Sequence, residues 1–278
     1  MNSIKWLAFT ILTVAIAFTA CRLDKDNNVD EGFTESITTT SEDQSTAENY
    51  FQDAEDQEDW AIETRDGGGG FTGCPTVTVE PADASFPRTI TIDFGDGCEG
   101  PYGRIRKGKI IVEQSAAIWE EGSVRTATFD QFFVDNAQIE GLRTIINEGY
   151  DQNGNITFSR TVSNGKITFP NGTSTTWESN YLLTQTAGGQ TPFILSDNVF
   201  EVTGNANGIN RNGKAYTATI DEPLLKNKLC PWLSEGLITL TIDSKTLTVD
   251  YGTGTCDNKA TLTLPNGAQQ EITIRRWW

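Results

Sequence analysis

The chain of 278 residues contains no histidine. Ser-His-Asp and Cys-His nucleophile systems are therefore excluded, together with metal centres built on imidazole. Carboxylate chemistry of the glycosidase kind remains, because it needs only two Asp or Glu side chains that face each other about 5 to 10 Å apart. The candidates are Asp93, Asp96, Glu99, Glu120, Glu121, Asp130 and Asp250. The sequence does not bring any two of them together, and most such carboxylates are solvated or cap turns, so we identify no catalytic residue.

The tripeptide Asp93-Phe94-Gly95 is the one with which protein kinases hold magnesium. A kinase also requires a Gly-rich phosphate loop and a His-Arg-Asp catalytic loop, and histidine is absent. The pattern returns at Asp250-Tyr251-Gly252, and both tripeptides follow alternating β-branched residues and precede a cysteine. Glycine permits the positive φ of a turn. We therefore interpret the tripeptide as the end of a strand.

Two oxygen-rich segments, residues 151–155 and 93–99, could suit a calcium ion, which prefers oxygen ligands. Neither segment reproduces a calcium loop with its distal bidentate glutamate. Asp and Asn are favoured in turns for backbone reasons alone. We therefore predict no metal and no cofactor, with calcium as the alternative for these two segments.

The N-terminus has a short apolar segment followed by a cysteine. Lys5 precedes an apolar run over residues 6–18, and Thr19-Ala20 stands directly before Cys21. This is the layout of a secretory signal peptide, and the run is too short to favour a membrane span. It resembles the lipobox of bacterial lipoproteins, which implies a signal peptide at residues 1–20 and lipidation of Cys21. An ordinary cleaved signal is the alternative, because Phe18 stands where a lipobox usually has leucine.

Four further cysteines, Cys74, Cys98, Cys230 and Cys256, form an even set in an exported chain. Three disulfide pairings are open to four cysteines. We favour Cys74 with Cys98 and Cys230 with Cys256, because the two segments look alike: each begins with Cys-Pro and ends with a strand, a glycine turn and a cysteine. Each pair closes a loop of about 25 residues, worth about 3 kcal/mol in the chain-entropy model. The alternative is a zinc site formed by the four cysteines. It is disfavoured because the chain contains no Cys-x-x-Cys pair.

Two clusters could bind a ligand. The basic residues Arg104, Arg106 and Lys107 could hold an anionic glycan or a carboxylate-bearing partner, although we favour the polar face of a strand that opposes the chain's own acidic leader. The terminal pair Trp277 and Trp278 could stack on sugar rings or lie at a membrane interface. We favour a role in covering the edge of the last strand.

The acidity of the chain is concentrated in a leader. Residues 22–66 hold 15 acidic and three basic residues, a net charge of −12 out of −17 for the whole chain. The leader is rich in Asp, Glu, Thr, Ser and Asn, and Gly67-Gly68-Gly69-Gly70 follows it. This composition predicts a disordered acidic tether over residues 21–72. The alternative is a short helix from Tyr50 to Trp60 that docks on the body. Nucleic acid is excluded as a partner, because neither part of the chain is basic.

Residues 73–278 read as one antiparallel β domain. Segments of alternating Thr, Val, Ile and Phe are separated by turn residues, among them the Asn-Gly pairs that favour tight hairpins. These pairs begin at Asn153, Asn164, Asn171, Asn212 and Asn266. We predict an all-β fold, an antiparallel meander that forms either a two-sheet sandwich or a strongly curved sheet. Two smaller domains that split near Gly188-Gly189 are the alternative.

Three stretches of the body carry a resemblance to a known group. They are FPRTITIDFGDGCEGPYGRIRKGKIIV, GNANGINRNGKAYTATIDEPLL, and the ending that runs from CPW to LTVDYGTGTCDNKATLTLPNG. They resemble a widespread family of Bacteroidota envelope lipoproteins over residues 74–275. The acidic residues that follow Cys21 are also similar to the export signal of Bacteroidota surface lipoproteins. The resemblance implies a location in the cell envelope, and it implies no enzymatic activity because none is assigned to that family.

The expected function is that of a non-enzymatic binding or structural module of the cell envelope. Arg22, rather than Asp, follows Cys21, which resembles the pattern that permits sorting to the outer membrane, on its periplasmic or cell-surface face. The expected partners are the membrane, through the lipid anchor, and a glycan or an envelope protein. A carboxylate-dependent glycan-active enzyme and an accessory subunit of an envelope complex are the alternatives.

Overall fold

The structure, a computed structural model, describes residues 31–66, 70, 73–100, 103–191, 197–230 and 232–273. Over these residues the chain forms one helix and fourteen strands. In chain order they are α1 (Glu31–Asp66), β1 (Thr76–Glu80), β2 (Arg88–Asp93), β3 (Cys98–Glu99), β4 (Ile105–Gln114), β5 (Val124–Val134), β6 (Ala137–Tyr150), β7 (Ile156–Thr168), β8 (Ser174–Ala187), β9 (Val199–Ile209), β10 (Ala215–Asn227), β11 (Glu235–Ile242), β12 (Lys245–Thr253), β13 (Lys259–Thr263) and β14 (Gln269–Thr273). The predicted fold of antiparallel strands is confirmed.

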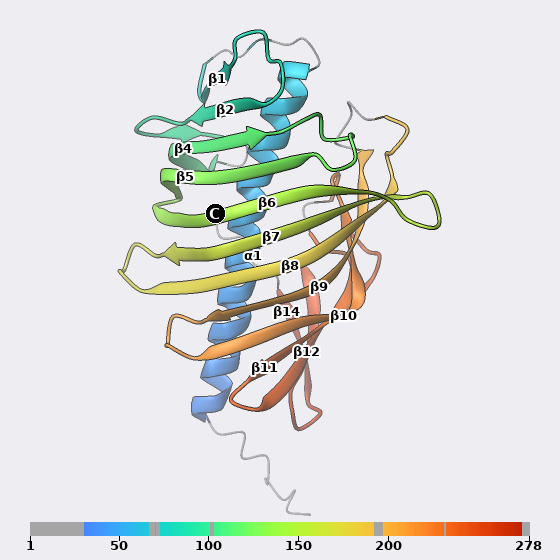
Figure 1. Cartoon of the computed structure of the whole chain (residues 1–278). Helices are drawn as coiled ribbons and strands as arrows, with labels where there is room; N and C mark the ends of the chain where they lie inside the picture. The colour runs from blue at the N-terminus through green and yellow to red at the C-terminus, as the bar shows by residue number, and fades with distance from the viewer. Residues whose placement is uncertain are drawn as a thin grey trace, which may run out of the picture.

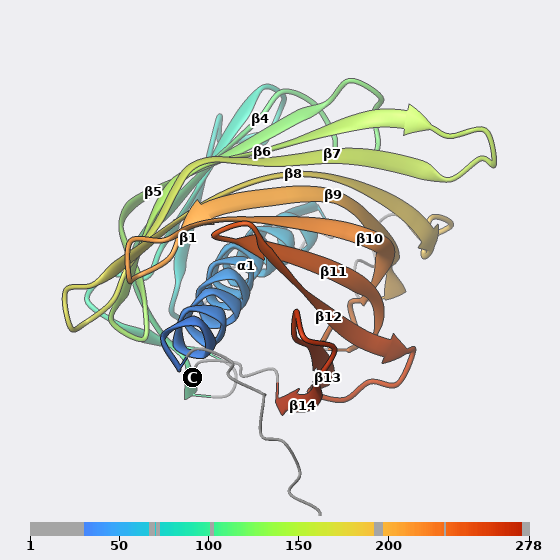
Figure 2. The same cartoon turned by 90° about the horizontal axis from the view of Figure 1, so that it is seen from below.

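The strands form a single sheet that follows the order of the chain from β1 to β14. β3 lies off this path and pairs with β4. The sheet is strongly curved, so that one face is concave (Figures 1 and 2). Of the two expected forms, the chain therefore adopts the curved sheet. β8 and β9 pair with each other on either side of Gly188-Gly189, so the sheet continues across that position.

Asn-Gly pairs close four of the hairpins in the same way, with the glycine amide donating to the carbonyl oxygen three residues earlier. These bonds are Gly154 to Asp151, Gly172 to Phe169, Gly213 to Asn210 and Gly267 to Leu264. The fifth pair, Asn164-Gly165, was expected to be a turn and is not one. It lies inside β7 at a β-bulge, where the register with β8 shifts between Val162 and Gly165. A Cβ at Gly165 would overlap the carbonyl oxygen of Trp177, so glycine is needed there for the close approach of two strands.

Helix α1 lies inside the concave face of the sheet (Figures 1 and 2). Its 36 residues span about 54 Å at 1.5 Å per residue. This corrects the expectation of a disordered tether for residues 31–66, while residues 21–30, 67–69 and 71–72 lie outside the described residues. The helix is much longer than the alternative that ran from Tyr50 to Trp60. Among the described residues, no helix is both long and apolar enough to cross a membrane.

The helix is buried on most sides although its composition is polar. Ile37, Tyr50, Phe51 and Ile62 join the hydrophobic core of the sheet. The ring of Phe51 lies 5.3 Å from the ring of Trp177 on β8, measured between centroids. Thr38, Thr39 and Thr40 stand in a row near the start of the helix, and β-branched residues have a weak helix propensity. Contacts with the sheet, more than propensity, therefore hold this segment in a helix.

Disulfides close the two corners that the sequence predicted. Cys74 pairs with Cys98 and Cys230 pairs with Cys256, and the Cα atoms are 5.8 Å apart in each pair. The preferred pairing is therefore confirmed. The first disulfide lies beside β1, β2 and β3, and the second joins the β10–β11 connection to the loop that follows β12.

The two tripeptides that end in glycine contain the same hydrogen bond. The Gly95 amide donates to the Asp93 carboxylate at 2.8 Å, and the Gly252 amide donates to the Asp250 carboxylate at 2.8 Å. Asp93 ends β2, as the sequence predicted. Asp250, Tyr251 and Gly252 instead lie inside β12, which continues to Thr253, and the register with β11 shifts beside them. The second tripeptide is therefore a bulge near the end of its strand.

Candidate functional site

Buried arginines of the sheet face carboxylates of the helix along most of its length. Five strands, β2 and β4 to β7, each supply one buried arginine, and Arg104 stands just before β4. The pairs are Arg88 with Asp66 at 2.7 Å, Arg104 and Arg106 with Asp53 at 2.7 and 2.6 Å, Arg125 with Asp59 at 2.9 Å, Arg143 with Glu58, and Arg160 with Glu55 at 3.0 Å. We call this set of contacts the sealed flank of the helix.

The basic cluster of the sequence is divided by the strand. Arg104 and Arg106 are buried and both bind Asp53 of the helix, as the preferred interpretation had it. Lys107 lies on the outer side, where its ammonium is 3.5 Å from the side-chain oxygen of Asn136. The cluster therefore does not present its three cations on one surface. The other predicted site residues, Cys21, Trp277 and Trp278, lie outside the described residues.

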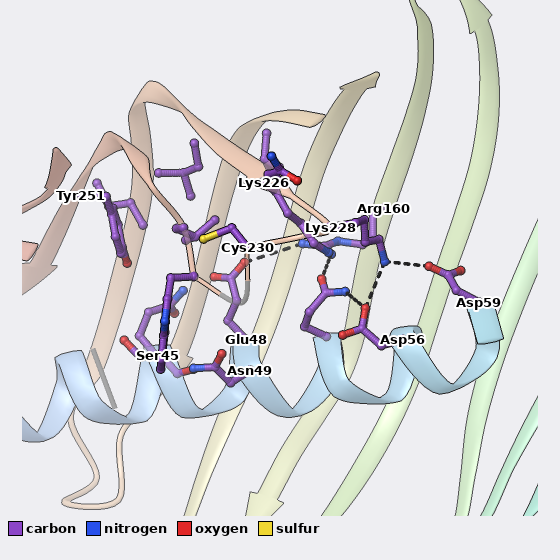
Figure 3. A pocket seen from close by; sticks show the side chains of 18 of the residues that line it. Ser45, Glu48, Asn49, Asp56, Asp59, Arg160, Lys226, Lys228, Cys230 and Tyr251 are labelled. Atoms are coloured by element: carbon purple, nitrogen blue, oxygen red, sulfur yellow. Dashed lines mark hydrogen bonds and ion pairs between the residues drawn. The ribbon is translucent and has the colours of Figure 1, made fainter. Parts of the chain in front are cut away.

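A cavity of about 300 Å³ opens beside the sealed flank, between α1 and the strands β7 and β9 to β12 (Figure 3). From the helix it is lined by residues spaced so that they share one face, namely Gln44, Ser45, Glu48, Asn49, Gln52, Asp56, Asp59, Trp60 and Glu63. From the sheet it is lined by Arg160, Val202, Leu224, Lys226, Asn227, Lys228, Cys230, Trp232, Leu233, Ile238 and Tyr251. We call the side of the helix that borders this cavity the hollow flank. Asp56 and Trp60 are exposed to solvent, which places the mouth of the cavity beside them.

The connection from β10 to β11 forms a lip over the cavity. The disulfide of Cys230 anchors it, and a bridge between Lys226 and Leu233 closes it on itself. The ammonium of Lys228 binds Asp59 at 2.8 Å and Asp56 at 3.0 Å, which fastens the lip to the helix. Burial opposes the charge of Lys228, but these two carboxylates outweigh burial and raise the pKa of Lys228 above its ordinary value.

Lys226 and Glu48 face the cavity from the sheet and from the helix, and neither has a close ion pair among the described residues (Figure 3). Glu63 also lines the cavity, four residues along the helix from Asp59. Within the described part of the chain, no hydrogen bond or ion pair engages the Lys226 ammonium. Burial and the neighbouring Lys228 lower the pKa of Lys226 to about 8. Burial raises the pKa of Glu48, whose contacts with Arg160 at 3.7 Å and with the Tyr181 hydroxyl at 3.4 Å are long. The cavity can therefore offer one cation and one anion to a ligand.

The carboxylates that the sequence singled out lie elsewhere. None of the seven candidates for glycosidase chemistry lines the cavity. The Asp151 carboxylate accepts the amides of Asn153 and Asn155 at 2.8 Å each, and these backbone bonds lower its pKa, Asn155 most strongly. The Asp93 carboxylate caps its own turn in the same manner. In the described ranges, no group of three or more Cys, Asp or Glu side chains is arranged to hold a metal ion.

Sequence reasoning missed the residues of the cavity for identifiable reasons. Glu48 belongs to the leader that was assigned to a tether, and Lys226 stands with Lys228 in a segment without a recognisable motif. One signal could have found this arrangement: an arginine recurs at an inward position of successive strands, which a folded domain tolerates only if acidic groups face it. Comparison of the chain with protein-family models, with curated proteins and with solved structures finds no match.

Proposed function

We propose that this protein is a cell-envelope lipoprotein that binds a small ligand, without transforming it, in the cavity between α1 and β9 to β12. The observation that carries the proposal is the cavity itself. Elsewhere along the helix, ion pairs and apolar side chains fill the space between helix and sheet. Its volume of about 300 Å³ is at the lower end of the range for small-molecule sites.

The envelope location rests on separate support. The layout around Cys21 and the resemblance to Bacteroidota lipoproteins favour a lipid anchor at the outer membrane. Two disulfides suit an oxidising, exported environment. In this proposal the anchored chain carries its ligand site at the membrane surface, and α1 is a wall of that site as well as part of the link to the anchor.

Binding is favoured over glycoside hydrolysis by the positions and contacts of the four acids that line the cavity. A glycosidase needs two acids that face each other about 5 to 10 Å apart and are free to exchange a proton and to stabilise charge. Lys228 holds Asp56 and Asp59 in ion pairs. Glu48 and Glu63 are separated by about 22 Å along the helix axis, which is too far for such a pair. The alternative is that the chain is an accessory subunit of an envelope complex. Recovery of a stable protein partner together with the chain would favour it.

The experiment is native mass spectrometry of the full chain purified from detergent-solubilised envelopes, followed by a thermal-shift screen of metabolites and glycans. We expect a bound small molecule whose mass is lost in Ser45→Phe, which fills the cavity from the helix. Thr38→Phe is the matched control, because Thr38 is exposed on the same helix and does not line the cavity. Turnover of a glycan by the wild type, or equal binding by both variants, would overturn the proposal.

A further inference from the structure

We propose that the cavity binds a small zwitterion with an apolar side chain, an α-amino acid or a short peptide, with its carboxylate against Lys226 and its ammonium against Glu48. This inference rests on the proposed function, because it assumes that the cavity is a ligand site. It adds the chemical class of the ligand and the two residues that recognise it.

The cations of the cavity differ in what already engages them. Arg160 binds Glu55 at 3.0 Å and Gln52 at 3.1 Å, and Lys228 binds two carboxylates of the helix. Lys226 has no such contact within the described residues. A cation that is largely withdrawn from water and left without a partner is unfavourable. A ligand carboxylate would supply the missing charge-assisted hydrogen bond.

Glu48 is in the corresponding position among the anions. Asp53, Glu55 and Asp59 of the helix have contacts of 2.6 to 3.0 Å with a cation. The nearest cation to Glu48 is farther, with its Arg160 contact at 3.7 Å. Glu48 and Lys226 come from α1 and β10, so a ligand that bridges the cavity meets both charges (Figure 3).

The rest of the lining is suited to one apolar side chain. Trp232, Leu233 and Tyr251 come from the lip and from β12, and Val202, Leu224 and Ile238 come from β9, β10 and β11. Burial of apolar ligand surface against these side chains is favourable. The small volume of the cavity limits that part of the ligand to the size of a single residue side chain or two.

Charge balance argues against ligands of one sign. A fatty acid would satisfy Lys226 but would leave Glu48 with only its long contacts to Arg160 and Tyr181, and it would add a negative charge near Asp56 and Glu63. A phosphate would add two negative charges at the same place. An amine would satisfy Glu48 and leave Lys226 unpaired. A zwitterion satisfies both groups and leaves the net charge of the site unchanged.

The proposal predicts a loss of affinity at both ends of the pH range. The charged groups that face Lys226 are Glu48, Glu55 and Asp56 on α1, Arg160 on β7 and Lys228 on the lip. Burial lowers the pKa of Lys226 to about 8, so the ammonium loses its proton and the affinity falls as the pH rises through that value. Burial raises the pKa of Glu48, so on the acid side the affinity falls at a higher pH than an exposed glutamate would give.

The test is isothermal titration of the full chain with leucine, the dipeptide Leu-Leu, leucinamide and N-acetylleucine. Leucinamide lacks the carboxylate and N-acetylleucine lacks the ammonium. We expect leucine or the dipeptide to bind about tenfold or more tightly than both blocked compounds, since each loses one charge-assisted hydrogen bond. The stronger of the two free compounds distinguishes an amino-acid site from a peptide site.

Two variants extend the test to the residues. Lys226→Met should abolish the preference for leucine over leucinamide, and Glu48→Gln should abolish the preference over N-acetylleucine. The matched controls are Lys214→Met and Glu178→Gln, which change exposed residues outside the cavity. Circular dichroism checks that each variant folds, and the pH profile of the wild type tests the same groups without any substitution.

Failure of this inference is distinct from failure of the proposed function. If the blocked compounds bind as well as the free ones, or if a fatty acid or a phosphate is the ligand that copurifies, the zwitterion is wrong while the cavity remains a ligand site. If Ser45→Phe and wild type bind the same compounds equally, both proposals fall.

Discussion

The two flanks of helix α1 contain the same kinds of residue and arrange them differently. On the sealed flank, arginines of β2 and β4 to β7 reach helix carboxylates at 2.6 to 3.0 Å in most pairs, so each arginine has a carboxylate close to it. On the hollow flank, a cavity of about 300 Å³ separates Lys226 from the helix, and its charge has no partner among the described residues. The difference separates charges that hold the fold from charges that are available to a ligand.

The sealed flank explains how a polar helix can be buried. A buried ion pair contributes little net stability compared with an apolar pair, but removal of one partner leaves an isolated buried charge, which is strongly unfavourable. The arginines contact carboxylates spread along the helix from Asp53 to Asp66, so a helix shifted along the groove would break several pairs at once. The pairs therefore fix the position of the helix, and with it the wall of the cavity.

The largest expected effect comes from breaking one pair of the sealed flank. Arg143 is 1% exposed and binds Glu58, which is 0% exposed. Arg143→Met should lower the free energy of unfolding by about 3 to 5 kcal/mol, because it leaves the buried Glu58 carboxylate with only its long contact to Arg125 at 3.8 Å. Urea unfolding followed by circular dichroism measures this loss.

The control for that substitution is Lys214→Met, which breaks an exposed ion pair with Asp243. Exposed pairs contribute about 0 to 1 kcal/mol, so the control should unfold almost as the wild type does. The double variant Arg143→Met with Glu58→Met should recover a large part of the loss. Equal effects of the two single substitutions would remove the distinction between the flank and the surface.

The second effect in size concerns the lip. Cys230→Ser with Cys256→Ser should lower the free energy of unfolding by about 3 kcal/mol and raise amide hydrogen exchange over residues 228–234, because the anchor of the lip is lost. Cys74→Ser with Cys98→Ser is the matched control. It should cost a similar stability and leave exchange in the lip unchanged. Equal exchange in the two double variants would show that the disulfide does not hold the lip.

The smallest effect concerns pH. The pKa of Lys226 in the folded chain is about 8, below its ordinary value of 10.5. Between these two values the unfolded chain binds more protons than the folded chain, so Lys226 makes stability rise with pH in that window. Its unfavourable contribution is complete below pH 8 and is lost above pH 10.5. The full shift corresponds to about 3 kcal/mol, but Lys226 is only partly buried, and solvent reduces the effect. The difference in unfolding free energy between Lys226→Met and wild type should therefore shrink by about 1 kcal/mol across the window, and a constant difference would contradict the shifted pKa.

The strands could be predicted because their signals are local. Alternation of apolar and polar residues predicted the antiparallel sheet, and Asn-Gly marked four hairpins. The similarity of the two cysteine segments predicted both disulfides. Asn164-Gly165 misled because the same dipeptide that makes a turn also makes a bulge, and the choice depends on the neighbouring strand.

The helix and the cavity could not be predicted in the same way, because their causes are not local. Asp53 and Glu55 look like residues of a solvated tether until Arg104, Arg106 and Arg160 are placed opposite them. Those arginines lie about 50 to 105 residues away in the chain. Lys226 was overlooked for a related reason. It differs from the other cations of the groove in having no ion pair among the described residues, and this difference is visible only in the folded chain.

The most direct test of the distinction between the flanks compares Arg143→Met with Lys226→Met in urea at pH 7. The account predicts opposite signs. Arg143→Met loses stability because a satisfied pair is broken, whereas Lys226→Met gains stability in the absence of ligand because an unfavourable buried charge is removed. A loss of stability of similar size in both variants would contradict it, since Lys226 would then be one more structural cation of the groove.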